Sequence, residues 1–580
     1  MTDVLVVSIF MLPIVLAVAI EETKRVRNYT KTLAFICLLQ VFIAAQVFFA
    51  EHNILFSQPI MVGAWLCALI AAMKPLLSRE SFLKSARWLG ITVFIPLTSF
   101  LVWLHPYIKN SSIRNGAPFS NANNDLAIYI ISADNFLNAG FKEFGRVVGY
   151  QAGALANFEV AGSSSFIAFI SRLSNQTVWR STNSSMLVLI ALSITCLYLL
   201  LRRWMIPPFI AMFSSVWAMS SSYARLPQQN YFLSQSISRL ALFSALLGLD
   251  FVMRSKSKSS VLGGVMVIFS SAWLSLVTYP AGSISSLVVL FAALLSYAVV
   301  GFVYKQPKKE ILVRSLLVLG GLVMPLPLLV NRWSLIQSNI SLYSRVNVTG
   351  WPAPTTFLPD WIGIPSLGPV WITWCVSGVT ITLFLIALSK LPKAKDPIVL
   401  RSFFLLITIL IAHIALAVKL QSDAYQVWKF LATVQPIAIC SLVAFITLSP
   451  KPLIYQFSRT SRLKTVSGLS LAGLMLLIGG NSVASSKTYI SITQKPSMEL
   501  ETASNQPSVH SPNLLIRLDP YLETMVAPVI LNLHDAIYAS DTYLGPASPE
   551  DPRCAISHSG DLNSVKVGER LFIGPASVCN

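Results

Sequence analysis

The sequence predicts a polytopic α-helical membrane protein with about 14 transmembrane helices, an outward loop carrying amphipathic helices and a small α/β C-terminal outer domain. Composition is the first reason: 54% of the 580 residues are hydrophobic and 12% are charged, against about 25% charged residues in soluble proteins. The second reason is the mean hydropathy, which at +0.66 is that of an apolar chain. The third reason is a series of long apolar segments. Together these observations exclude an ordinary cytosolic enzyme and a disordered chain.

The apolar segments are long enough to cross a bilayer, which requires about 20 residues in a helix. The first is not expected to be a cleavable signal peptide, because no basic residues precede it and no small-x-small site follows it. The predicted spans are 4–20, 32–50, 60–77, 88–104, 185–201, 205–220, 236–253, 260–278, 283–303, 311–330, 369–389, 398–418, 427–448 and 465–483.

The basic residues gather in every second loop between these spans, as at 24–31, 202–203 and 254–258. Cytoplasmic loops of membrane proteins collect Lys and Arg, so these loops are expected to be cytoplasmic and both termini to face outward. The net charge of +19 is then a topology signal and does not argue for nucleic acid. We predict a multi-pass protein of the cell membrane, specifically a bacterial inner membrane.

The predicted organisation has four parts: a four-span segment (1–104), an outer loop with interfacial helices (105–184), a ten-span membrane domain (185–483) and a small outer domain (484–580). A further long outward loop covers 331–368. The cytoplasmic loops are short, and loops held on a rigid scaffold often carry function. We therefore expect the chemistry on the outer side.

The first outer loop contains a predicted amphipathic helix that begins at Asp125 and ends before Gly140. A carboxylate suits a helix N-terminus and glycine suits a C-cap. One face of the helix is apolar; it consists of Leu126, Tyr129, Ile130, Ala133, Phe136 and Leu137. The stretch 158–174 is a candidate second interfacial helix, of the type that lies along a membrane surface.

The C-terminal tail is predicted to contain short strands within 511–520, 529–540 and 568–574, and a helix within 519–530. It also holds Cys554 and Cys579, whereas the other five cysteines lie in predicted spans. An outward, oxidising compartment favours a disulfide between these two residues. Two free thiols are the alternative.

The sequence contains no Walker loop, GxSxG, HExxH or CxxC pair in a useful context. These motifs would have indicated an ATP-driven pump, a serine hydrolase or a zinc enzyme. The remaining candidates are carboxylates and basic residues near the outer surface. No cofactor is identified, and a role for a divalent cation is left open.

The segment NNDLAIYIISADNFLNAGF resembles the first outward catalytic loop of the GT-C superfamily, polytopic glycosyltransferases that use polyprenyl-phosphate sugars. Asp125, Tyr129, Ala133 and Gly140 match its spacing. Tyr279-Pro280, the segment DAYQVWKF (423–430) and the tail segment YLETMVAPVIL are similar to pieces of uncharacterised bacterial members. One departure is that the loop follows the fourth predicted span, whereas in most of the superfamily it follows the first.

The resemblance implies an inverting transfer of a sugar to a glycan, lipid or protein acceptor. Such transfer needs a base near an oxocarbenium-like centre and cations for the phosphate leaving group. The predicted catalytic carboxylates are Asp125, with Asp134 second. The predicted phosphate-binding residues are Arg146, Arg225, Arg239 and Lys429. The predicted acceptor-binding residues are Tyr129, Gln421, Tyr425, Trp351 and Trp361.

Each candidate also has a plainer interpretation. These interpretations remain open: Asp125 as a helix N-cap, Asp134 as a solvated helix residue, Arg146 and Arg225 as solvated loop charges, and Arg239 and Lys429 as cations that extend to headgroups. The tryptophans suit an interfacial aromatic belt. For the whole chain, an O-antigen-type polymerase or ligase that relies on outer arginines is the second hypothesis, and a transporter of lipid or polysaccharide is the third.

Overall fold

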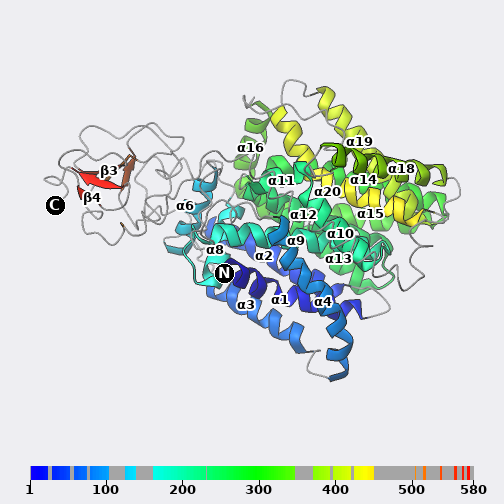
Figure 1. Ribbon diagram of the computed structural model, residues 1–580, viewed down its shortest axis with the longest axis horizontal. Helices are drawn as coiled ribbons and strands as arrows, with labels where there is room; N and C mark the ends of the chain where they lie inside the picture. The colour runs from blue at the N-terminus through cyan, green and yellow to red at the C-terminus, as the bar shows by residue number, and fades with distance from the viewer. Residues whose placement is uncertain are drawn as a thin grey trace.

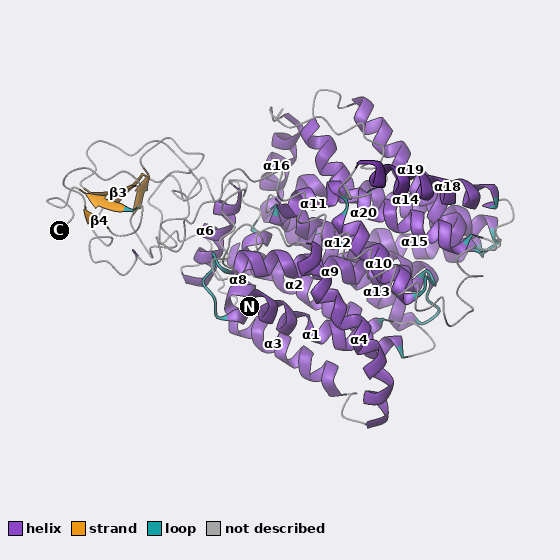
Figure 2. Ribbon diagram, in the orientation of Figure 1, coloured by secondary structure: helices purple, strands orange, loops and turns teal. Residues whose placement is uncertain are grey.

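The computed structural model describes most of the helical part of the chain and a few strands of the tail. The described residues are 2–23, 29–51, 58–74, 79–102, 125–138, 161–229, 232–345, 363, 370–391, 396–419, 424–449, 503, 514–517, 536–538, 554–557, 565–566 and 571–574. Helices make up the body of the molecule, and the strands lie beyond one end of it (Figures 1 and 2).

Apolar segments form the helices because a helix satisfies all its backbone groups without water. The helices are α1 (Thr2–Glu22), α2 (Thr30–Glu51), α3 (Gln58–Met73), α4 (Arg79–Val102), α6 (Asp125–Asn138), α8 (Gly162–Ser174), α9 (Ser181–Arg203), α10 (Pro208–Ser220), α11 (Ser222–Gln229), α12 (Leu233–Arg254), α13 (Lys258–Thr278), α14 (Pro280–Val303), α15 (Lys308–Val323), η2 (Leu326–Arg332), α16 (Trp333–Arg345), α18 (Val370–Ser389), α19 (Pro397–Lys419) and α20 (Ala424–Leu448).

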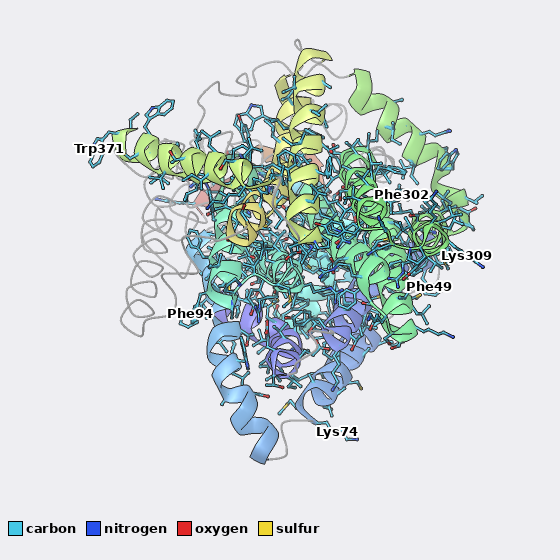
Figure 3. The ribbon with its side chains drawn as sticks, turned by 90° about the vertical axis from the view of Figure 1, so that its right-hand side faces the viewer. Phe49, Lys74, Phe94, Phe302, Lys309 and Trp371 are labelled. Atoms are coloured by element: carbon cyan, nitrogen blue, oxygen red, sulfur yellow. The ribbon has the colours of Figure 1, made fainter. Side chains whose placement is uncertain are left out.

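Eight of the helices are long and apolar enough to cross a membrane, and five shorter apolar helices accompany them in the described part of the chain. They overlap the predicted spans up to residue 448, so the chain is a multi-pass membrane protein. The predicted span at 465–483 lies outside the described residues, and the total of fourteen stays a prediction. Large apolar side chains such as Phe94 (56% exposed) and Trp371 (66%) line the rim of the bundle (Figure 3).

The bundle has two chemically different ends. We call one the α6 end; there α1, α9, α12, α14 and α20 begin, and Asp3 at the start of α1 accepts a hydrogen bond from Ser184 of α9. We call the other the basic end, because Arg202, Arg203 and Arg254 lie there at the ends of α9 and α12. The alternating helix directions place these arginines together, as the loop charges predict.

Several of these basic residues are buried in ion pairs, which the sequence did not indicate. Arg202 forms a bidentate ion pair with Glu22, in which Nε and Nη2 each donate to a carboxylate oxygen at 2.7 Å. The side chains of Arg202 and Glu22 are 2% and 0% exposed. Tyr29 and Tyr198 also donate hydrogen bonds to Glu22, each at 2.9 Å. Burial, and then the Glu22 carboxylate, raise the pKa of Tyr29 above its ordinary value, so the phenol keeps its proton. The network joins α1, α9 and the residue directly before α2.

A second network surrounds Asp250, whose side chain is fully buried. Its carboxylate accepts hydrogen bonds from Arg203 and Tyr297, and from Trp204 and Arg254 at 3.2 Å each. These partners come from the ends of α9, α12 and α14. The two networks hold the basic end together through charges that compensate one another.

Helices α12 and α13 pack backbone to backbone at two glycines. A Cβ added at Gly264 would lie 2.6 Å from the carbonyl oxygen of Gly248, closer than any real Cβ contact. Small residues at membrane helix interfaces permit such an approach. The neighbouring Gly263 has open space at the same point.

We expect Gly264→Ala to lower the stability of the protein by about 1–3 kcal/mol, because the new methyl group forces the two helices apart. Gly263→Ala is the matched control and should leave the unfolding temperature in detergent unchanged or slightly higher, because alanine favours the helix. Equal unfolding temperatures for the two variants would contradict the close packing.

Helix α6 begins at Asp125, as predicted, and its predicted apolar face is enclosed: Leu126, Ile130 and Ala133 are fully buried. The helix predicted within 158–174 is present, and its position at a membrane surface stays a prediction. This helix is α8, and its first ten residues, from Gly162 to Ser171, are buried. Glycine and serine allow a tight fit between helices, so this part of α8 is enclosed by other helices.

The tail contains a five-stranded sheet in the order β2-β1-β3-β5-β4. Three of its strands lie in the predicted segments. Parallel pairing joins β1 to β2 and β3, and antiparallel pairing joins β5 to β3 and β4. The predicted tail helix falls outside the described residues. The strands are β1 (Leu514–Arg517), β2 (Ala536–Tyr538), β3 (Cys554–Ser557), β4 (Val565–Lys566) and β5 (Phe572–Gly574).

Candidate functional site

Polar side chains from α6, α8 and α12 meet at the α6 end. Ser234 at the start of α12 donates a hydrogen bond to the Tyr129 hydroxyl at 3.0 Å. It also shares a hydrogen bond of 2.6 Å with Ser163, in the first turn of α8. The residue predicted from the GT-C-like spacing, Tyr129, is thus attached to the membrane domain. This contact fixes α6 against the first turns of two other helices.

The start of α12 also connects to α20. Gln235 donates from Nε2 to the backbone oxygen of Lys429 at 3.1 Å. Lys429 lies near the beginning of α20, with its Nζ 5.3 Å from the centre of the Tyr279 ring. Two segments that are far apart in the sequence, Tyr279-Pro280 and 423–430, are therefore neighbours in the fold.

Arg239 lies one turn after Gln235 and is 1% exposed. Its guanidinium donates to the backbone oxygen of Ala224 at 2.6 Å and, over 3.4 Å, to Ser236. Its Nε has no hydrogen-bond partner among the described residues. An arginine held in this way is expensive to bury without a function.

Helix α11 supplies a third cation. Arg225 follows directly after Ala224, the residue that Arg239 contacts, and is 7% exposed. The preceding Tyr223 stacks edge-on against Trp428 at 4.6 Å, and its N–H donates to Gln435 Oε1 at 3.2 Å. These contacts bring α11, α12 and α20 together, so that Arg225, Arg239 and Lys429 belong to one region. We call these three residues the cation cluster.

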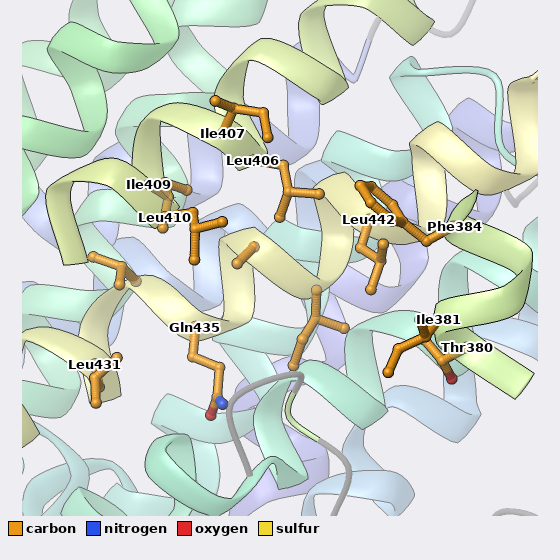
Figure 4. A pocket seen from close by; sticks show the side chains of 13 residues that line it. Thr380, Ile381, Phe384, Leu406, Ile407, Ile409, Leu410, Leu431, Gln435 and Leu442 are labelled. Atoms are coloured by element: carbon orange, nitrogen blue, oxygen red, sulfur yellow. The ribbon is translucent and has the colours of Figure 1, made fainter. Parts of the chain in front are cut away.

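An apolar groove adjoins this region between α18, α19 and α20. Its volume is about 290 Å³, and its polar lining residues are Thr380 and Gln435 (Figure 4). The groove follows α20 from Leu431 to Leu442, and Gln435 in its lining accepts a hydrogen bond from the backbone N–H of Tyr223 in α11. Leu410 in its wall is 44% exposed, so the groove opens at the lipid-facing surface. Its shape and lining suit a hydrocarbon chain.

The structure corrects three of the plainer interpretations. Asp134 is not solvated, since it is only 6% exposed, and Arg225 is not a loop charge, since it is buried in α11. Arg239 does not extend to headgroups, because it is held by the backbone of Ala224. No group of three His, Cys, Asp or Glu side chains that might hold a metal occurs in the part of the chain with described placement.

The remaining predicted residues are tested less directly. Asp125 opens α6, Tyr425 lies in the first turn of α20 and Cys554 begins β3, but the placement of their side chains is not described. The disulfide therefore stays a prediction. Arg146, Trp351, Trp361, Gln421 and Cys579 lie outside the described residues.

Sequence reasoning missed Gln435, Tyr223 and the two serines, Ser163 and Ser234. A glutamine inside an otherwise apolar span, beside Pro436, was the available signal for Gln435. The serines carried no signal, because serine is frequent throughout the chain and its role depends on which helices meet.

The sequence matches no known protein family and no curated protein. Among solved structures, the chain is similar to the crystal structure of ArnT from Cupriavidus metallidurans bound to undecaprenyl phosphate. The TM-score is 0.49 at 12% sequence identity, and the match covers 83% of this chain and 97% of ArnT. A likeness of this degree assigns neither an activity nor a ligand to the chain.

Proposed function

We propose that the protein is an integral-membrane glycosyltransferase of the GT-C type. It transfers a sugar from a polyprenyl-phosphate donor to a glycan, lipid or protein acceptor at the α6 end of the bundle. The basic end faces the cytoplasm by the positive-inside rule, so the α6 end faces outward. In a bacterium this membrane is the inner membrane, and both termini lie outside.

One observation carries the proposal: the cation cluster adjoins an apolar groove that opens to lipid. Arg239 has a buried Nε without a partner among the described residues and binds the backbone oxygen of Ala224. The adjacent Tyr223 donates its backbone N–H to Gln435, which lines the groove. A lipid phosphate needs both features, because its head is anionic and its tail is hydrocarbon. A soluble nucleotide sugar would need only the first.

The reaction assigns a role to each part. An acceptor hydroxyl attacks the anomeric carbon, the bond from that carbon to the donor phosphate breaks, and the hydroxyl proton passes to Asp125. The polyprenyl phosphate leaves with the extra negative charge, which Arg239, Lys429 and Arg225 stabilise. Asp125 precedes Tyr129 by one helical turn, and Tyr129 binds Ser234, so α6 brings the base toward the start of α12.

An O-antigen-type polymerase or ligase is the second candidate, because the buried Arg225 and Arg239 also suit a site that depends on outer arginines. It predicts that activity survives the loss of Asp125. A transporter is less well supported: carboxylates in the described spans, such as Glu22 and Asp250, lie near helix ends, whereas transporters usually carry charges at mid-membrane.

Replacement of Arg239 tests the donor site. We expect Arg239→Ala to weaken binding of undecaprenyl phosphate in nanodiscs by at least about tenfold, because a charge-assisted hydrogen bond is lost. The matched control is Arg172→Ala, which removes an exposed arginine of α8 and should leave binding unchanged. Native mass spectrometry measures both, and an unfolding curve confirms that each variant is folded. Equal affinity for the two variants would remove the cation cluster from donor binding.

A further inference from the structure

The aromatic ring of Tyr279 holds the ammonium group of Lys429. Tyr279 links the end of α13 to Pro280 at the start of α14, and Lys429 comes from α20. The Nζ lies 5.3 Å from the ring centroid, within the range in which the negative face of an aromatic ring attracts a cation. The attraction leaves the positive charge of the ammonium group in place.

The Tyr279 ring is fixed in position from two sides. Its backbone N–H donates to the oxygen of Ser275 at 2.8 Å, and its side chain is 7% exposed. Gly282 lies against the ring, since a Cβ there would come 2.0 Å from Cδ1. Any larger residue at 282 would displace the ring, so the glycine is part of this arrangement.

Lys429 is fixed through its backbone. Its carbonyl oxygen accepts hydrogen bonds from Gln235 Nε2 at 3.1 Å and from Thr433 Oγ1 at 2.9 Å. The flexible part of the residue is its four-carbon side chain, which ends in a mobile point charge. The ring of Tyr279 restricts that part.

We propose that Tyr279 is a positioning residue for the donor site. It orders the Lys429 ammonium group so that the charge faces the lipid phosphate, and it thereby reduces the entropy lost on binding. The expected effect on binding of the lipid phosphate rests on the proposed function, whereas the contact between the ring and the ammonium group does not. Tyr279 is not assigned a contact with the substrate.

A double-mutant cycle tests the consequence, with undecaprenyl phosphate in nanodiscs as the probe. Tyr279→Leu should raise the dissociation constant by about three- to thirtyfold, and Tyr279→Phe by less than about twofold, because phenylalanine keeps the ring face. In a Lys429→Ala background, Tyr279→Leu should change the constant by less than about twofold. Phe291→Leu, a lipid-facing replacement on α14, is the control and should have no effect.

A purely structural role would weaken binding equally in both backgrounds, and that result would overturn the proposal, as would full affinity in Tyr279→Leu. The contact is read independently by NMR of protein whose lysines carry ¹³C-methyl groups, with the Lys429 signal assigned from Lys429→Arg. Its upfield ring-current shift should disappear in Tyr279→Leu and persist in Tyr279→Phe. If the shift behaves so but wild-type protein does not bind the lipid phosphate, the proposed function fails while the positioning contact stands.

Discussion

Asp125→Asn is expected to reduce sugar transfer by about 10²- to 10⁴-fold, the contribution typical of a general base. The asparagine keeps the shape of the side chain and can still cap α6, but it does not accept the hydroxyl proton. Affinity for undecaprenyl phosphate should stay within about twofold of wild type, since the cation cluster and the groove are unchanged. Transfer is measured with a radiolabelled polyprenyl-phosphate sugar in membranes of cells that express each variant.

Asp134→Asn is the matched control on the same helix. It is expected to reduce transfer less than Asp125→Asn, because Asp134 does not match the catalytic spacing. Protein level and membrane insertion are compared for both variants. Full activity of Asp125→Asn, together with inactivity of Arg239→Ala, would contradict the carboxylate mechanism and favour the polymerase or ligase.

The second large effect is on stability and concerns the basic end. Asp250→Ala should destabilise the protein by about 3–5 kcal/mol, because it leaves Arg203 and Arg254 without their buried counter-charge. The hydrogen bonds from Trp204 and Tyr297 to the carboxylate are lost as well. The measurement is thermal unfolding of the purified protein in detergent.

Glu310→Gln is the control for this effect. Glu310 pairs with Arg314 within α15 at 2.7 Å, but its side chain is 51% exposed. Solvent screens such a pair, and its loss should cost less than about 1 kcal/mol. A similar small effect for Asp250→Ala would mean that the buried network does not hold α9, α12 and α14 together.

The sequence predicted α6 well because its signals are local. A carboxylate at the start, an apolar face at helical spacing and a glycine after the end all lie within one segment. The burial of helix α8 was not predicted, for the opposite reason. Its serines resemble a polar surface, yet they are buried because Ser163 and Ser165 bind side chains of other helices, Ser234 and Gln46.

The basic end shows a similar limit. The positions of Arg202, Arg203 and Arg254 between spans correctly indicated that they share one end of the bundle, but loop charges are expected to be solvated. Their burial depends on Glu22 and Asp250, which belong to α1 and α12. Which acidic residue meets which arginine is a matter of helix packing, and no local pattern encodes it.

The candidate site falls between these cases. Arg239 and Lys429 could be singled out because each is a cation near the end of an apolar span. Their connection through Gln235 and Ala224 required the arrangement of α11, α12 and α20. The groove beside them was not predictable, because its walls are ordinary apolar residues of three spans.

The central claim is that one site binds a lipid phosphate at the α6 end, and a structure determined by electron cryomicroscopy with undecaprenyl phosphate in a nanodisc tests it most directly. We expect the phosphate beside Arg239 and Lys429, and the first isoprene units along the groove of α18, α19 and α20. A phosphate bound at the basic end, or a lipid tail lying on other helices with the groove empty, would contradict the claim.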